Sequence, residues 1–193
     1  MRRICVFCGS SLGNWPEYAK SAAELGRLIA SQGLELVYGG GNVGLMGVVA
    51  DAALAAGGKV IGVIPEALMQ WELGHPALSE LRVVASMHER KAMMADLADG
   101  FIALPGGIGT LEELFEIWTW AQLGLHSKPL GILDSAGYYD HLHHFLDRMT
   151  TDGFVKSRHR DMVAVESDPA RLLTRMRGYT PPATIQVIDH ETT

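Results

Sequence analysis

Short apolar runs alternate with helical patterns along nearly the whole chain, and this alternation constrains the fold more than any other feature. A repeated strand–helix–strand order builds a parallel sheet with helices over both faces. Near-continuous apolar runs, such as Val-Ile-Gly-Val-Ile at residues 60–64, are typical of strands covered on both sides. The sequence therefore predicts an α/β fold with one Rossmann-like, doubly wound, mainly parallel sheet.

The length of 193 residues fits one domain with a sizeable core. No repeat or shift in composition divides the chain, so we expect one domain over residues 1–178 and a C-terminal tail over 179–193. We expect strands at residues 3–8, 35–38, 59–64, 81–85, 100–104, 129–133 and 162–165. We expect helices near residues 16–31, 45–56, 87–98, 111–125, 138–151 and 169–177.

The charge balance limits the partners of this protein. A formal net charge of −6 argues against a nucleic-acid binder, which normally presents a basic face. We find no apolar stretch long enough for a signal peptide or a membrane span, so we expect a cytoplasmic protein without membrane contact.

Glycine-rich segments follow three of the predicted strands. They are Gly9-Ser10-Ser11, residues 39–44 (Gly-Gly-Gly-Asn-Val-Gly) and residues 105–109 (Pro-Gly-Gly-Ile-Gly). In doubly wound folds, ligands bind at the carboxyl ends of the strands, so we expect these loops to converge on one site. Residues 39–44 also match the dinucleotide fingerprint Gly-x-Gly-x-x-Gly. That fingerprint belongs after the first strand, so we favour a nucleotide phosphate or ribose loop over a nicotinamide site.

Residues 101–113 join an apolar strand to a helix through a glycine turn. Glycines allow close approach of backbone N–H groups, and a helix N-terminus carries partial positive charge, so this junction suits a phosphate. Glu113 places a carboxylate one turn into the helix. A phosphate site beside an acid suggests an enzyme that acts on a phosphorylated small molecule. The alternative is a capping box, in which Thr110 caps the helix and Glu113 reaches back to it.

A second capping box, Ser86-x-x-Glu89, is expected to open the helix after the fourth strand. It puts Arg90 and Lys91 in the first turns of that helix, where basic residues oppose the helix dipole. An anionic partner would explain them, and a solvated basic pair is the alternative.

Other motifs favour structural roles. Cys5 and Cys8 lie three residues apart on a strand, so we interpret them as buried thiols on opposite faces and not as a redox pair. His141, His143 and His144 lack further ligands at a recognisable spacing, so we expect a solvated histidine face and no metal site.

The helix expected over residues 111–125 has apolar residues on two sides. One side can pack on the sheet, and the second needs another cover. A symmetric dimer with Ile117 or Trp120 in its interface would supply that cover. Cover by a neighbouring helix of the same chain is the alternative.

Residues 105–113, Pro-Gly-Gly-Ile-Gly-Thr-Leu-Glu-Glu, match the Pro-Gly-Gly-x-Gly-Thr-x-x-Glu motif of the LOG ("Lonely Guy") family. The likeness continues through residues 7–11, 39–47, 87–91 and 118–124, and so covers nearly the whole chain in order. The chain resembles cytokinin riboside 5′-monophosphate phosphoribohydrolases, which carry the older label lysine decarboxylase. The resemblance implies a Rossmann-like catalytic domain, a nucleotide substrate and a homodimer, and we expect neither a cofactor nor a metal.

By this resemblance Arg90 and Glu113 are the catalytic pair. It assigns contacts with the nucleotide to a larger set in the glycine loops and nearby helices: Gly9, Ser10, Gly41, Gly44, Glu72, Lys91, Gly107, Ile108, Gly109, Thr110, Leu111, Glu112 and Thr119. Apolar residues could form a pocket for the base or belong to the core: Trp71, Met87, Met93, Met94 and Trp120.

The implied reaction is hydrolysis of the N-glycosidic bond of an adenosine 5′-monophosphate, with or without an N6 substituent, to the free base and ribose 5-phosphate. Two alternatives stay open. A nucleotide carrier or sensor would keep the glycine loops but would need no acid at Glu113. A pyridoxal-phosphate decarboxylase would need a Schiff-base lysine, for which Lys91 is the candidate.

Overall fold

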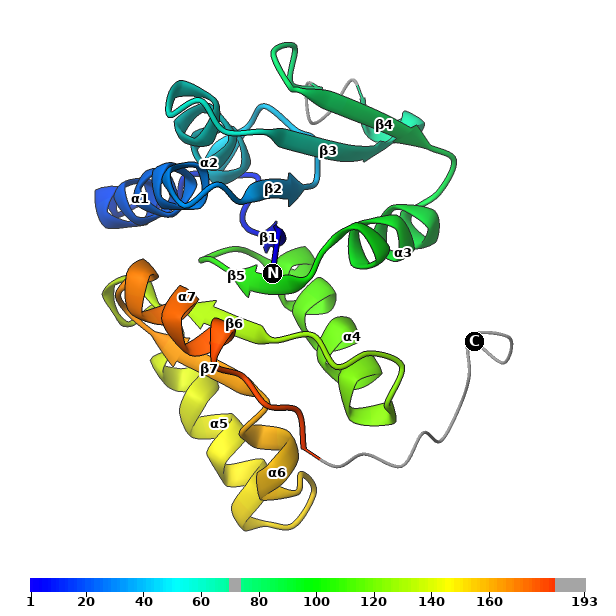
Figure 1. Ribbon diagram of the computed structural model, residues 1–193. Coiled ribbons are helices and arrows are strands. Elements are labelled where there is room, and N and C mark those ends of the chain that lie inside the picture. The colour runs from blue at the N-terminus through cyan, green and yellow to red at the C-terminus, as the bar shows by residue number, and fades with distance from the viewer. Residues whose placement is uncertain (70–73, 183–193) are drawn as a thin grey trace.

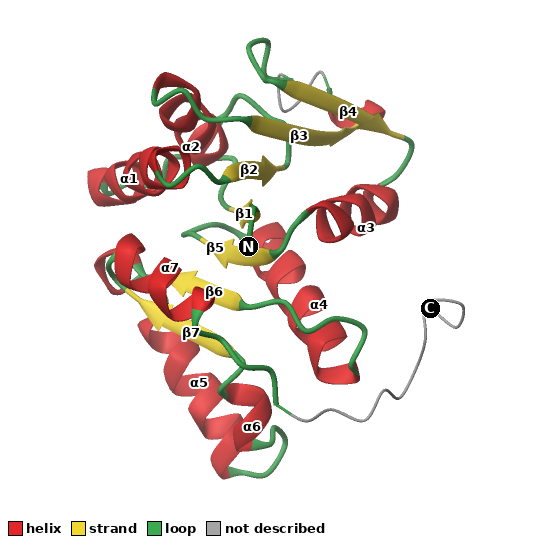
Figure 2. Cartoon of the chain, in the orientation of Figure 1, coloured by secondary structure: helices red, strands yellow, loops and turns green. Residues whose placement is uncertain are grey.

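The structure is a computed structural model that describes residues 1–69 and 74–182. Its described residues form one seven-stranded sheet in the order β4-β3-β2-β1-β5-β6-β7, and every pair of neighbouring strands is parallel. This arrangement, with helices on both faces (Figures 1 and 2), confirms the predicted α/β fold. The strands are β1 Arg3–Phe7, β2 Glu35–Tyr38, β3 Val60–Pro65, β4 Glu80–Val84, β5 Gly100–Ala103, β6 Leu130–Leu133 and β7 Val163–Glu166.

The α-helices are α1 Pro16–Ser31, α2 Gly44–Ala55, α3 Met87–Leu97, α4 Ile108–Leu123, α5 Asp140–Thr151, α6 Ser157–Arg160 and α7 Pro169–Arg177. Two 3-10 turns, Glu66–Leu68 and Ser135–Gly137, follow β3 and β6. Most boundaries agree with the sequence prediction to within two residues. The short α6 was not predicted, because one turn of helix is too short to show a helical period.

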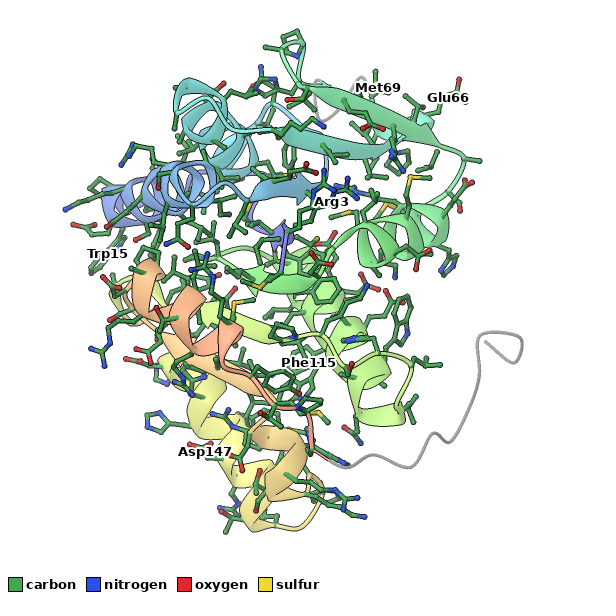
Figure 3. All side chains as sticks on the ribbon, in the orientation of Figure 1. Arg3, Trp15, Glu66, Met69, Phe115 and Asp147 are labelled. Carbon is green, nitrogen blue, oxygen red and sulfur yellow. The ribbon has the colours of Figure 1, made fainter. Side chains whose placement is uncertain are left out.

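Two apolar layers hold the fold together. The helices α1, α2 and α7 cover one face of the sheet, and α3, α4 and α5 cover the other (Figure 1). Figure 3 shows side chains filling the space between the sheet and both helical layers. Cys5 and Cys8 are both buried and belong to opposite layers, as predicted. No helix formed by residues 1–69 or 74–182 is long and apolar enough to cross a bilayer.

The chain reverses its direction of winding between β1 and β5. From β1 it adds strands outward to β4, then returns to place β5 on the other side of β1. Such a switch point leaves a crevice at the carboxyl ends of the two central strands. The segments that begin at Gly9 and Pro105 meet there, and the N–H of Gly9 donates to the carbonyl oxygen of Pro105 at 3.0 Å.

The helix α4 differs from its prediction at both ends. It begins at Ile108 with Gly107 as N-cap, three residues before the predicted start, and it ends at Leu123. Gly124 takes a left-handed conformation (φ 83°), and the N–H of Leu125 donates to the carbonyl of Trp120 at 2.9 Å. This geometry closes a helix at a glycine and explains why the apolar pattern continues beyond the helix end.

Candidate active site

A cavity of about 300 Å³ lies at the switch point of the sheet. Its wall combines the glycine loops after β1 and β5, the start of α4, and residues from α2 and α3. The predicted site residues in the wall are Gly9, Ser10, Arg90, Gly107, Ile108, Gly109, Thr110, Glu112 and Glu113. The structure thus brings together the two predicted catalytic residues and most of the predicted glycine loop.

The loop after β5 presents backbone to this cavity. The first hydrogen bond of α4 runs from the N–H of Leu111 to the carbonyl of Gly107 at 3.2 Å, so the preceding N–H groups have no acceptor within the helix. A Cβ atom at Gly107 or Gly109 would meet nothing within 4 Å. The two glycines therefore leave open space in front of the positive end of a helix, as an anion requires.

Thr110 does not cap α4, which corrects one interpretation of the Thr-x-x-Glu pattern. Gly107 occupies the N-cap position and makes no side-chain cap, and Thr110 is the third residue of the helix. The alternative prediction of a capping box formed by Thr110 and Glu113 is therefore wrong. At α3 the predicted cap by Ser86 is confirmed, because the N–H of Glu89 donates to Ser86 Oγ at 3.1 Å. The Glu89 carboxylate reaches back one residue further than predicted and accepts from the N–H of Ala85 at 2.7 Å.

Arg90 lies inside the protein. Its side chain is buried, with the residue 4% exposed, and Nη2 donates to the carbonyl oxygen of Gly39 at 3.1 Å. A Cβ atom at Gly39 would come within 1.9 Å of Nη2, so only glycine allows the guanidinium to lie there. The alternative of a solvated basic pair is wrong for Arg90, because a buried guanidinium needs acceptors or negative charge close by.

Glu113 is half-buried and lines the same cavity as Arg90. The charges of both side chains reach the thiol of Cys5, which is buried in β1 and does not line the cavity. Burial raises the pKa of Cys5 well above its usual value, the charge of Glu113 raises it further, and the charge of Arg90 opposes that rise. The carboxylate and the guanidinium therefore lie within electrostatic reach of the same buried thiol.

Lys91 has a different position from its neighbour in sequence. It is buried, and Nζ donates to Glu112 at 2.5 Å and to Glu116 at 3.0 Å, which ties α3 to α4. Burial lowers the pKa of Lys91, but hydrogen bonds from its ammonium to Glu112 and Glu116 outweigh burial and raise that pKa overall. Lys91 is therefore held as a cation by two carboxylates and does not line the cavity.

Several predicted contacts lie outside the cavity wall. Gly44 adopts a left-handed φ of 56°, and a Cβ atom there would overlap the Ser10 backbone at 2.3 Å, so this glycine lets two loops meet. Gly41 pairs with Gly74 in an isolated antiparallel bridge.

Thr119 is exposed on α4. The predicted residues outside the cavity wall are Gly41, Gly44, Lys91, Leu111 and Thr119, and their contact with a ligand stays a prediction. Glu72 and Trp71 lie outside the described residues.

The cavity also has an apolar wall that sequence reasoning identified only in part. Met87 and Met94 line it as considered from the sequence, whereas Met93 and Trp120 do not. Gly39 also lines it, at the start of the predicted glycine loop 39–44. Residues that the sequence analysis did not assign to the site line it as well: Val6, Phe7, Cys8, Met46 and Leu68. Val6, Phe7 and Cys8 lie at the carboxyl end of β1 or directly after it, and that position is the signal that could have found them.

The comparisons with known proteins agree with these motifs. A family described as "Possible lysine decarboxylase" matches residues 46–176. The probable cytokinin riboside 5′-monophosphate phosphoribohydrolase LOGL9 of Oryza sativa subsp. japonica is 50% identical over 180 residues, which cover 93% of this chain and 79% of that protein. The chain belongs to the LOG family.

LOG1 of Arabidopsis thaliana, a cytokinin riboside 5′-monophosphate phosphoribohydrolase, is 48% identical over 93% of this chain and 84% of its own. Solved structures show the same fold at lower identity. The molybdenum cofactor binding protein of Rippkaea orientalis has a TM-score of 0.69 at 24% identity, over 92% of this chain and 96% of its own. The molybdenum cofactor carrier protein of Chlamydomonas reinhardtii has a TM-score of 0.69 at 23% identity, over the same shares.

Proposed function

We infer that this LOG-family chain is an N-glycosyl hydrolase that cleaves adenosine 5′-monophosphates, with or without an N6 substituent, to free base and ribose 5-phosphate. The observation that carries this proposal is the cavity at the switch point, in which an open helix N-terminus lies beside Glu113 and Arg90. A phosphate site beside a carboxylate is the combination that this reaction needs.

The phosphate binds at the start of α4 in this proposal. The N–H groups of Gly107, Ile108 and Gly109 and the helix dipole donate to its oxygens. Ser10 adds a hydroxyl from the loop after β1. The binding energy of the phosphate then fixes the ribose over the floor of the cavity, which reduces the entropic cost of reaching the transition state.

The chemistry develops positive charge on the ribose ring. The bond between C1′ and the base nitrogen breaks, the base leaves with the electron pair, and a water oxygen adds at C1′. The Glu113 carboxylate stabilises the cationic sugar and accepts the water proton, and a proton is returned to the leaving base. The hydrogen bond to the Gly39 carbonyl fixes the position of the Arg90 guanidinium. Its positive charge balances the negative charges of the Glu113 carboxylate and the phosphate. The apolar wall of Met46, Leu68 and Met87 suits the base.

The ion pairs of Lys91 count against a pyridoxal-phosphate enzyme. A Schiff base forms only from the neutral amine, and two carboxylates hold this lysine in its charged form. A nucleotide carrier remains the competing function, because it would use the same phosphate site without needing Glu113.

We also propose that the protein is a cytoplasmic homodimer with Trp120 in its interface. Ile117, the other residue considered, is 2% exposed and packs in the core of its own chain, so it cannot contact a partner. Trp120 is half-buried on the same helix, beside an open hollow of about 340 Å³ that it forms with Leu125 and other residues. A second copy of the chain would cover this hollow.

A nucleotide panel tests the activity. The protein is incubated with adenosine 5′-monophosphate, its N6-isopentenyl derivative and the two ribosides, and the released base is measured by chromatography. We expect base from the monophosphates, and about three orders of magnitude less from the ribosides, because two or three charge-assisted hydrogen bonds are lost. Equal release from riboside and monophosphate would contradict the phosphate site.

Substitution of the acid separates the enzyme from the carrier. Glu113→Gln removes the charge and keeps the shape, so turnover should fall by at least ~100-fold while binding of the monophosphate persists. Glu116→Gln is the control, because Glu116 is one turn away on the same helix and accepts a hydrogen bond from Lys91. Binding of the monophosphate by the wild type without any release of base would establish a carrier.

A further inference from the structure

The turn between β6 and α5 contacts the phosphate loop through two tyrosines. Tyr138 Oη donates to the carbonyl oxygen of Gly106 at 2.6 Å, and Tyr139 Oη donates to the carbonyl oxygen of Leu104 at 2.6 Å. The two acceptors flank Pro105, so the hydroxyls hold the loop on both sides of the proline. Both bonds are short for hydroxyl donors and neutral acceptors.

The turn that carries these tyrosines is unusual in its backbone. Ala136 adopts a left-handed conformation (φ 54°, ψ 31°), which costs roughly 1 kcal/mol or more for a residue with a side chain. The carboxylate of Asp134 accepts from the N–H of Tyr139 at 2.9 Å and closes the turn. The two tyrosine rings then meet edge to face, with centroids 4.8 Å apart. Such a strained segment persists only where its surroundings hold it.

The hydroxyl of Tyr139 remains a donor at any physiological pH. The residue is 3% exposed, and burial raises the pKa of its hydroxyl far above the usual value for tyrosine. Its bond to Leu104 therefore does not depend on ionisation.

The bond from Tyr138 also determines where the next N–H points. In a planar trans peptide the C=O and N–H groups point in opposite directions. The C=O of Gly106 points toward Tyr138, so the N–H of Gly107 points away from it. Tyr138 and Gly106 line a second hollow, of about 270 Å³, and neither lines the cavity of Arg90 and Glu113. Gly107 lines both, together with Gly9 and Ser10, so the peptide between Gly106 and Gly107 lies where the two hollows adjoin.

We propose that Tyr138 and Tyr139 are positioning residues that orient the peptide between Gly106 and Gly107, so that its N–H faces the phosphate in the catalytic cavity. This inference rests on the phosphate site of the proposed function. The tyrosines touch no substrate. They act by fixing a backbone donor in advance, which removes part of the cost of ordering the loop when the phosphate binds.

The test compares Tyr138→Phe and Tyr139→Phe with Tyr18→Phe. The ring of Tyr18 meets that of Tyr138 edge to face at 5.5 Å, so the control removes a hydroxyl from the same aromatic cluster without touching either bond to the loop. Adenosine 5′-monophosphate is titrated by calorimetry into each protein in the Glu113→Gln background, and KM and kcat are measured without that substitution. Unphosphorylated adenosine serves as a competitive inhibitor.

We expect each loop-contacting variant to raise KM and Kd for the monophosphate about fivefold, the effect of one neutral hydrogen bond. The inhibition constant of adenosine should stay within about twofold of the wild type, since adenosine lacks the group that the loop binds. Tyr138 is 43% exposed, so its variant should keep the thermal midpoint of the wild type even if the buried Tyr139→Phe is less stable.

Two results would overturn the inference: unchanged affinity for the monophosphate in both variants, or an equal loss of affinity for monophosphate and adenosine. Failure of the proposed function looks different. If the wild type binds the monophosphate without hydrolysing it, and the tyrosine variants bind it less well, the positioning role stands while the hydrolase is excluded. A wild type that binds no monophosphate would overturn both.

Discussion

At the residue scale, substitution of Gly109 should change stability and turnover in opposite directions. Its backbone is helical, and a Cβ atom there would enter open space in the cavity. Alanine favours helix over glycine by up to about 1 kcal/mol, so Gly109→Ala should raise the free energy of unfolding slightly. The added methyl fills the space of the phosphate, so turnover of the monophosphate should fall by about tenfold or more, the effect of displacing charge-assisted hydrogen bonds. Urea denaturation and initial rates measure the two effects.

Gly178→Ala is the matched control for that substitution. A Cβ atom at Gly178 makes only ordinary contacts, at 3.7 Å and beyond, and the residue lies at the end of α7 outside the cavity. Its activity should equal that of the wild type. A Gly109→Ala protein with unchanged KM and kcat would mean that the phosphate lies elsewhere.

At the element scale, the turn after α4 contains a pH-sensitive contact. His126 Nε2 donates to the carbonyl of Ile117 at 2.8 Å, and Nδ1 accepts from the N–H of Lys128 at 3.1 Å. Both bonds together require the neutral ring, because a proton on Nδ1 would oppose the Lys128 N–H. Burial lowers the pKa of His126, the nearby Lys128 charge lowers it further, and the Ile117 carbonyl acts in the other direction.

The sign of the pH effect follows from this lowered pKa. The unfolded chain binds a proton on His126 near pH ~6.5, before the folded protein does. The stabilisation is therefore complete above that pH and is lost as the pH falls through the lower pKa of the folded state. Urea unfolding between about pH 7.5 and 5 should show a steeper loss of stability for the wild type than for His126→Gln, which cannot titrate. Parallel profiles would show that His126 does not contribute.

At the scale of the whole molecule, Trp120 on α4 provides a test of the proposed dimer. If a second copy covers Trp120, the wild type should sediment as a dimer, and Trp120→Asp should give monomers because a desolvated charge in an interface is costly. Phe154→Asp is the control. Phe154 is 84% exposed in the segment before α6, so an added charge there should leave assembly unchanged. A monomeric wild type at micromolar concentration would exclude the dimer.

From the sequence alone one can predict the order and type of the main elements and the sheet edge at which the candidate site lies. The bounds of α1, β2 and α7 agree with the prediction residue for residue, because periodicity, proline and capping signals act between near neighbours in the chain. The glycine loops converge as predicted, because all strands of a parallel sheet end at the same edge. Arg90 and Glu113 could be placed at this edge for the same reason, because each lies in the first turns of a helix that follows a strand, whereas their pairing as catalytic residues came from the resemblance to the LOG family.

The contacts that each of these side chains makes depend on the tertiary structure. Sequence neighbours Arg90 and Lys91 point to different partners, a backbone carbonyl in one case and two carboxylates in the other. The burial of Ile117 and the contacts of Tyr138 and Tyr139 with the glycine loop likewise join segments that are distant in the chain. No local pattern contains this information, because burial and hydrogen bonding depend on which elements become neighbours when the sheet closes around β1 and β5.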